Sequence, residues 1–325
     1  MADDDGWDYA DPCPVCGHDG RWCRESGDGA VVLCYREESD RQTGSGGWLH
    51  YLDDPDPTKR RERLPVALLA ATEAAWRDQG YSAILARLNL SAAHRAGLRR
   101  RGLTDDAIDR AGYRTMLAQA MVFPRSDIVG GAIPRVPGLS QVRDRGRWLA
   151  FLGPFDQGAV VPGALIPVRD PAGRIVHHVL APDDRTGGKY KWPAGAGVHV
   201  HVPLAPELDR RTVRVTEGQL KADVATALSG VLTIGLPGLA WRWARPTLAA
   251  LGARTVLVAF DSDKATNDAV ARAEADLVAF LRSAAYRVEI ETWDPAHKGI
   301  DDALAAGADI RRSAPLKTAT RKRAS

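Results

Sequence analysis

The strongest constraint on the fold is a regular alternation of strand-like and helix-like segments in the last third of the chain. Short runs of Val, Ile and Leu alternate with longer segments whose apolar residues recur at helical spacing. The expected strands cover residues 212–216, 231–235, 255–260 and 287–293, and the expected helices cover 220–228, 246 onward, 269–284 and a short segment after 299. Strands that are joined through helices run parallel, because the helix returns the chain to the same end of the sheet. The sequence therefore predicts an α/β domain with a mostly parallel sheet over residues 206–308.

Carboxylates follow the ends of two of these strands. Glu217 ends the first expected strand, Asp261 and Asp263 follow the third, and Asp301 lies in the turn before the last short helix. Open α/β sheets hold ligands at the carboxyl ends of their strands. Crowded carboxylates repel one another unless cations neutralise them, and oxygen ligands of this kind suit Mg²⁺ or Mn²⁺. Each Asp could instead serve only as the cap of the helix that follows it.

All the cysteines lie near the N-terminus. The four residues are Cys13, Cys16, Cys23 and Cys34. The Cys-Pro-Val-Cys pair is typical of the knuckle of a zinc ribbon, so we predict a structural Zn²⁺ site within residues 1–52. The segment has few aliphatic residues, and the metal would supply much of its folding free energy. His18 or His50 could replace a thiolate, and free reduced thiols are the simpler alternative.

Composition is that of an ordinary globular protein, with 45% hydrophobic and 26% charged residues and a net charge of +3. The chain opens with Met-Ala-Asp-Asp-Asp, which is acidic where a secretory signal would be basic. No apolar run approaches the ~20 residues of a membrane span. We therefore expect a cytoplasmic protein without a membrane partner.

The central part of the chain divides by composition. A proline-rich, charged linker is expected over residues 53–65, a helical and mixed α+β region over 66–205, and a basic flexible tail over 309–325. Thr104 is expected to cap a helix, and the arginines at 99–101 are most simply a solvated face. The histidines at 177, 178, 199 and 201 have no matching acid or cysteine nearby in the sequence, which disfavours a second metal site.

A basic hairpin is expected in this region. Two strand-like runs flank the turn Asp170-Pro171-Ala172-Gly173, with Arg169 and Arg174 beside it. The segment Lys189-Tyr190-Lys191-Trp192 then interleaves basic and aromatic residues. Such a pattern suits phosphate contacts and base stacking, so single-stranded nucleic acid is a candidate partner.

These motifs, in this order, resemble a TOPRIM domain: the Glu217-Gly218 turn, the Asp261-Ser262-Asp263 pair and the Lys298-Gly299-Ile300-Asp301 turn. Three further segments resemble the catalytic core of bacterial DNA primases: Arg101 to Ile108, the hairpin over 166–175, and Gly188-Lys189-Tyr190. With the cysteine ribbon in front, the chain is similar to the divergent primases of plasmids, phages and integrative elements.

The resemblance implies a nucleotidyltransferase that makes short primers on single-stranded DNA by two-metal catalysis. It assigns Mg²⁺ or Mn²⁺ to Glu217, Asp261, Asp263 and Asp301, and it assigns template and nucleoside triphosphate to Arg169, Arg174, Lys189 and Lys191. It also allows a separate replicative helicase as a partner.

One departure from the family concerns position 221. Bacterial primases often carry an acid four residues after the site glutamate, where this chain has Lys221. A lysine there could pair with the acids or weaken metal binding. Two alternatives therefore stay open: a TOPRIM nuclease, and a catalytically inactive accessory protein that binds single-stranded DNA.

Overall fold

The computed structural model describes most of the chain in two compact units. Described are residues 7–18, 22–27, 31–39, 41–43, 46–52, 66–117, 121–124, 136–144, 147–152, 161–186, 188–193, 196–238, 240–262 and 267–314, with backbone only in 66–72, 121–124, 139–144 and 147–152. One unit comprises residues 1–76 with 195–198, and the other comprises 77–194 with 199–325. The expected linker, Asp263 and most of the expected tail lie outside the described residues.

The first unit contains a small antiparallel sheet. Its strands, in spatial order, are β1 (Trp7–Tyr9), β2 (Arg24–Ser26), β3 (Val31–Cys34) and β4 (Trp48–Tyr51). Its buried residues are few and include Cys13, Cys23, Val32 and Cys34. The cysteines therefore form much of the interior of this sheet region, as expected of a domain too small for a large apolar core.

The second unit starts with helices that flank an antiparallel sheet. The helices are α1 (Val66–Leu85, which begins in the first unit), α2 (Ala92–Arg100) and α3 (Asp105–Ala111). The sheet has the order β10 (Ile175–Pro182), β9 (Gly163–Arg169), β5 (Arg114–Met116). A further sheet has the order β6 (Met121–Pro124), β8 (Arg147–Leu152), β7 (Leu139–Asp144).

Local sequence explains the ends of these elements. The side chain of Thr104 accepts a hydrogen bond from the Ala107 N–H at 3.2 Å, which confirms the expected cap of α3. The β9–β10 hairpin is confirmed as well, and its turn is closed by Asp170, whose Oδ1 accepts the N–H groups of Ala172 and Arg174 at 2.9 and 3.0 Å. Gly173 has φ 82°, a conformation in that turn which other residues rarely adopt.

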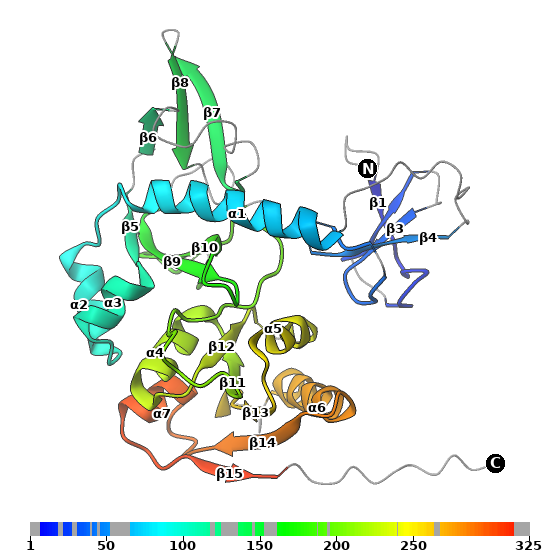
Figure 1. The fold of residues 1–325 in the computed structure, drawn as a ribbon, viewed down its shortest axis with the longest axis vertical. Helices are drawn as coiled ribbons and strands as arrows, with labels where there is room; N and C mark the ends of the chain where they lie inside the picture. The colour runs from blue at the N-terminus through cyan, green and yellow to red at the C-terminus, as the bar shows by residue number, and fades with distance from the viewer. Residues whose placement is uncertain are drawn as a thin grey trace. The chain divides into compact units, whose positions relative to one another are not determined.

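The C-terminal part is the predicted α/β domain (Figure 1). Its elements are β11 (Thr212–Glu217), α4 (Gln219–Ser229), β12 (Thr233–Leu236), the 3₁₀ helix η4 (Trp241–Trp243), α5 (Ala244–Leu251), β13 (Thr255–Val258), α6 (Asp268–Ser283), β14 (Arg287–Thr292), α7 (Ile300–Ala305) and β15 (Arg311–Ser313). The sheet order is β12-β11-β13-β14-β15, and all pairs are parallel except β14 with β15. The predicted fold class, a mostly parallel α/β domain after a mixed α+β region and an N-terminal cysteine-rich sheet, is therefore confirmed.

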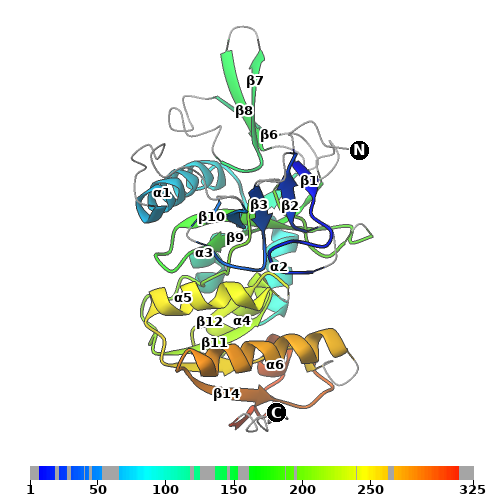
Figure 2. The same cartoon turned by 90° about the vertical axis from the view of Figure 1, so that its right-hand side faces the viewer.

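Helices cover both faces of this sheet. Helices α5 and α6 lie on one face and α4 and α7 on the other, as the two views show (Figures 1 and 2). The first face is the larger core, where Val213 and Val258 of the sheet pack with Leu248 of α5 and Leu277 of α6. The second core joins Ala225 of α4 to Ile300 of α7. Near-continuous apolar strands such as β13 are expected where both faces are buried.

Strand β15 begins within the segment for which the sequence predicted a flexible tail. The three residues Arg311 to Ser313 pair antiparallel with β14, and the Arg312 side chain forms an ion pair with Glu291 at 3.0 Å. Because β15 has no apolar residue, its sequence carries no strand signal. None of the described helices is both long and apolar enough to cross a membrane.

Candidate active site

The parallel register brings the predicted acids to one edge of the sheet. Val215 of β11 lies opposite Val258 of β13, so Glu217 and Asp261, which follow these residues closely, stand at the same carboxyl edge. Asp301 reaches this edge as the second residue of α7. Asp261 and Asp301 are 5% and 2% exposed, and Glu217 is half-buried. Asp263 lies outside the described residues, so its place in this group stays a prediction.

Hydrogen bonds fix the loop after β13 against the turn before α7. The Ser262 N–H donates to the carbonyl of Lys298 at 2.8 Å, and the Ser262 hydroxyl donates to the carbonyl of His297 at 2.9 Å. The indole N–H of Trp293 donates to the same His297 carbonyl at 2.8 Å. These bonds hold the segments that carry Asp261 and Asp301 in a fixed relation.

Both of these aspartates have basic partners from the protein. Lys221 of α4 forms an ion pair with Asp261 Oδ1, and Lys298 Nζ lies 4.0 Å from Asp261 Oδ2. Arg101, in the turn between α2 and α3, forms an ion pair with Asp301 Oδ2. The other oxygen, Asp301 Oδ1, is buried and has no hydrogen-bond partner within the part of the chain that the structure describes. The expected pairing of Lys221 with the acids is thus present. The simplest interpretation of Arg101, as part of a solvated face, is wrong, because Arg101 is paired with a buried acid.

Lys189 belongs to the same electrostatic group. Burial lowers the pKa of Lys189, and repulsion by Lys221 and Arg101 lowers this pKa further, while Asp261 and Asp301 oppose the shift. Tyr190 beside it has a pKa raised by burial. Basic side chains from both halves of the second unit therefore converge on the two acids.

The other predicted phosphate ligands make contacts within the protein. Arg169 donates to the carbonyls of Gly173 and Ala111 at 2.9 and 3.3 Å, and burial lowers its pKa. Arg174 pairs with Asp170 at 2.7 Å across the hairpin turn. Lys191 exchanges backbone hydrogen bonds with Leu180 at 2.9 Å. Roles for these three residues in phosphate binding stay predictions.

A buried hydrogen-bond network couples the hairpin to α4. Asp223 accepts hydrogen bonds from the hydroxyl of Tyr113 and from His201 Nε2, the latter at 3.0 Å. The Arg169 N–H donates to His201 Nδ1 at 3.1 Å, so Nδ1 is the acceptor and Nε2 carries the proton. No motif in the sequence indicates this network, because its members lie far apart along the chain.

The cysteines have the geometry of a metal site. Their four sulfur atoms lie within 4.8 Å of one another, with 3.9 Å between Cys16 and Cys23 and 3.8 Å between Cys23 and Cys34. A tetrahedral Zn²⁺ with Zn–S bonds of about 2.3 Å would separate its sulfurs by about 3.8 Å. The N–H groups of Arg36 and Glu37 donate to Cys34 Sγ at 3.4 and 3.3 Å, which suits a thiolate.

The histidine alternatives do not enter this sulfur group. His50 Nε2 makes a hydrogen bond with the carbonyl of Glu37 at 3.0 Å, and the His18 carbonyl accepts the N–H of Cys13 at 3.1 Å. Among the described residues, the cysteine set is the one group of His, Cys, Asp or Glu side chains with the spacing of metal ligands. The four cysteines therefore fit the predicted structural zinc.

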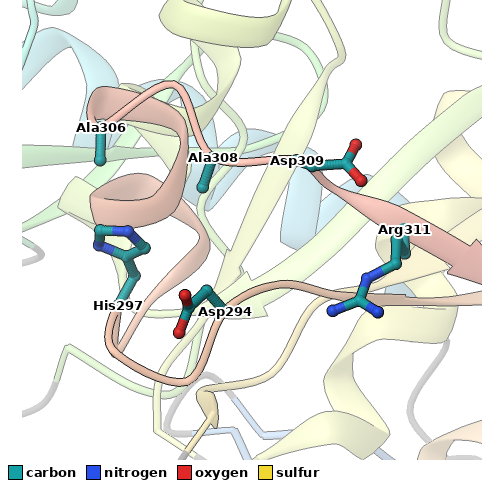
Figure 3. A pocket seen from close by; sticks show the side chains of 6 residues that line it. All are labelled: Asp294, His297, Ala306, Ala308, Asp309 and Arg311. Carbon is teal, nitrogen blue, oxygen red and sulfur yellow. The ribbon is translucent and has the colours of Figure 1, made fainter.

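A hollow of about 420 Å³ lies beside α7. Its lining consists of Asp294, His297, Ala306, Ala308, Asp309 and Arg311 (Figure 3). Neither Asp261 nor Asp301 lines it. His297 lines the hollow, and its carbonyl accepts a hydrogen bond from Ser262, the residue that follows Asp261.

Comparison with known proteins gives one family match and a set of similar structures. Residues 208–310 match a family described as "Domain of unknown function (DUF3854)". No curated protein sequence was found to be significantly similar to this one.

Structures of primases are among the similar ones. The Aquifex aeolicus primase (zinc-binding and RNA polymerase domains) is 12% identical with a TM-score of 0.46, covering 92% of this chain and 78% of that one. A DnaG primase catalytic domain bound to single-stranded DNA is 16% identical with a TM-score of 0.48, covering 74% and 81%. The RNA polymerase domain of Mycobacterium tuberculosis primase DnaG is 19% identical with a TM-score of 0.45, covering 76% and 84%.

Proposed function

We propose that this protein is a primase-like nucleotidyltransferase that makes short primers on single-stranded DNA. The observation that carries the proposal is the convergence of Arg101, Lys189 and Lys221 on Asp261 and Asp301 at the carboxyl edge of a parallel sheet. A site that binds triphosphates needs carboxylates to hold divalent cations and basic side chains to contact the phosphate oxygens. The resemblance to plasmid and phage primases makes replication of a mobile element the expected setting.

The acids fit a divalent cation by their chemistry. Carboxylate oxygens are the ligands that Mg²⁺ and Mn²⁺ prefer, and Asp301 Oδ1 is a buried acceptor that no described residue hydrogen-bonds. Glu217, Asp261, Asp263 and Asp301 would hold the metal. Bound there, it would neutralise the triphosphate and lower the pKa of the attacking 3′-hydroxyl.

The remaining groups position the substrates. Lys189 interacts electrostatically with both aspartates, so a phosphate that it binds would lie close to the acids. Trp192 is 40% exposed, and its ring lies 6.3 Å from that of Tyr190. An exposed indole beside a lysine offers a base-stacking surface next to a phosphate ligand. We assign these residues to the nucleotide or the template, and the cysteine sheet to the template strand.

Incubation with single-stranded DNA, labelled NTPs or dNTPs, and Mg²⁺ or Mn²⁺ tests the proposal directly. New short products are expected from the wild type, and Asp261→Ala or Glu217→Ala should reduce their yield at least about 100-fold if each carries part of the chemistry. Asp276→Asn is the matched control, because Asp276 is an exposed residue of α6. Undiminished synthesis by both acid variants would contradict the site assignment, and shortening of the DNA would indicate a nuclease instead.

A second candidate function is a catalytically inactive accessory protein that binds single-stranded DNA. The ion pair between Lys221 and Asp261 favours it, since the ammonium already neutralises one predicted metal ligand. Binding of DNA that survives Asp261→Ala and Glu217→Ala, with no product under any metal, would support this function.

A further inference from the structure

Lys221 is placed where a helix disfavours a cation. It is the third residue of α4, and the N-terminal end of a helix carries the positive end of the helix dipole. Its side chain is only 12% exposed, and that of its partner Asp261 is 7% exposed. A buried ammonium at this end of a helix needs compensation from carboxylates. The position of Lys221 is therefore explained by the acids and not by the helix.

The ammonium of Lys221 also lies near the second aspartate. A Cβ on Gly299 would lie 2.4 Å from Asp301 Oδ1 and 3.3 Å from Lys221 Nζ. Both groups therefore crowd the same small space, which is open because residue 299 is glycine. Lys221 thus forms an ion pair with Asp261 and also lies near Asp301 Oδ1, an oxygen with no hydrogen-bond partner among the described residues.

We propose that Lys221 is an internal counter-ion that occupies the place of a divalent cation at Asp261 and competes with the metal for this carboxylate. The inference rests on the proposed function, since it concerns the same acids. A fixed ammonium lets these carboxylates lie together in the metal-free protein. A divalent cation that binds Asp261 must displace Lys221 or share the carboxylate with it, which lowers the affinity of the site for metal.

Binding of Mn²⁺ tests this without any nucleotide or DNA. The free Mn²⁺ signal in electron paramagnetic resonance is followed during titration of the full-length, zinc-loaded chain. Lys221→Met keeps the length of the side chain and removes its charge, and we expect it to bind Mn²⁺ at least about tenfold more tightly than the wild type, a ratio equivalent to about 1.4 kcal/mol. Lys221→Glu should bind Mn²⁺ more tightly still.

Lys298→Met is the matched comparison. Lys298 lies 4.0 Å from Asp261 but is 63% exposed, so its removal should change the Mn²⁺ affinity by less than about threefold. Asp301→Asn in the Lys221→Met background should reverse the gain. If Lys221→Met is poorly folded without metal, its melting temperature should rise more with added Mg²⁺ than that of the wild type.

The outcomes separate this inference from the proposed function. Equal Mn²⁺ affinity of the wild type, Lys221→Met and Lys221→Glu overturns the competition by Lys221, even if the wild type makes primers. Tighter Mn²⁺ binding by the Lys221 variants in a protein that makes no primer supports the competition and contradicts only the proposed function.

Discussion

Arg101 and Asp301 form an ion pair that joins the turn between α2 and α3 to the start of α7, across 200 positions of the chain. Asp301 is buried and Arg101 is about one-third exposed, with side-chain exposures of 1% and 32%. The pair connects the helical region to the α/β domain at the candidate active site. Substitution of either residue should therefore change both the stability of the second unit and the electrostatic potential at the acids.

Arg101→Met should lower the free energy of unfolding by about 2 kcal/mol, because it leaves the carboxylate of Asp301 buried without its charged partner. Urea denaturation followed by circular dichroism measures this. Arg99→Met is the control: Arg99 pairs with Asp105, both side chains are about half exposed, and little change in stability is expected because solvent screens an exposed pair. Equal changes in the free energy of unfolding for the two variants would show that the Arg101–Asp301 pair contributes no more than an exposed pair.

The buried pair of Arg214 and Glu291 joins β11 to β14 on either side of β13. Arg214 Nε donates to Glu291 at 2.6 Å, and Arg214 also donates to Ser229 and Thr233. Arg214→Met should destabilise the protein by about 3 kcal/mol, because Glu291 then stays buried with the half-exposed Arg312 as its one charged partner among the described residues.

A double-mutant cycle separates the pair from simple packing. Glu291→Leu combined with Arg214→Met should cost less than the sum of the two single changes, because no buried charge is left alone. Strict additivity in thermal unfolding would mean that the two charges do not interact energetically. Arg287→Met, which removes an arginine that is 76% exposed, serves as the surface control.

The sequence predicted the sheet and its helices because each strand is an apolar run and each helix has its own periodicity. It also predicted that Glu217, Asp261 and Asp301 would lie at one edge, because the ends of parallel strands share an edge; among the described residues these acids do not have the spacing of metal ligands, so their metal role stays a prediction. The sequence predicted only some of the basic partners of these acids. Lys221 could be suspected from its distance to Glu217, whereas Arg101 belongs to another part of the chain, and only the packed structure brings it to Asp301.

The arginines of the basic hairpin make contacts that their residue type alone does not predict. Arg169 and Arg174 look like phosphate ligands because arginine often is one. In the structure the same guanidinium groups close the turn through Gly173 and Asp170. A pattern of residue types does not say whether a donor will be used by the protein itself or by a ligand.

Zinc should be held by the four thiolates and not by a histidine. Cys23→Ser should reduce the zinc content from one ion per chain to none, because a tetrahedral structural site needs all four ligands. Metal analysis of the purified protein measures this, and limited proteolysis should show faster cleavage within residues 7–52. His50→Gln should keep its zinc, since the His50 ring contacts the Glu37 carbonyl. Loss of zinc from His50→Gln would contradict the all-cysteine site.

Acid should weaken the fold through the buried histidines of β10. Burial lowers the pKa of His178 from 6.5 to about 3, and its ring contacts that of Tyr81 edge-on at 5.1 Å. The unfolded chain takes up this proton near pH 6.5, whereas the folded chain takes it up only near pH 3. The stabilisation is therefore present above pH 6.5 and is lost progressively as the pH falls toward 3.

This residue alone should lower the free energy of unfolding by about 2 kcal/mol between pH 7.5 and pH 5. His178→Phe keeps an aromatic ring against Tyr81 and cannot take up a proton, so its stability should fall less steeply with acid than that of the wild type. The neighbouring His177, whose pKa burial also lowers, should leave a residual slope in the variant. Urea denaturation of both proteins across this pH range measures the difference, and identical slopes would show that His178 is not buried in its neutral form.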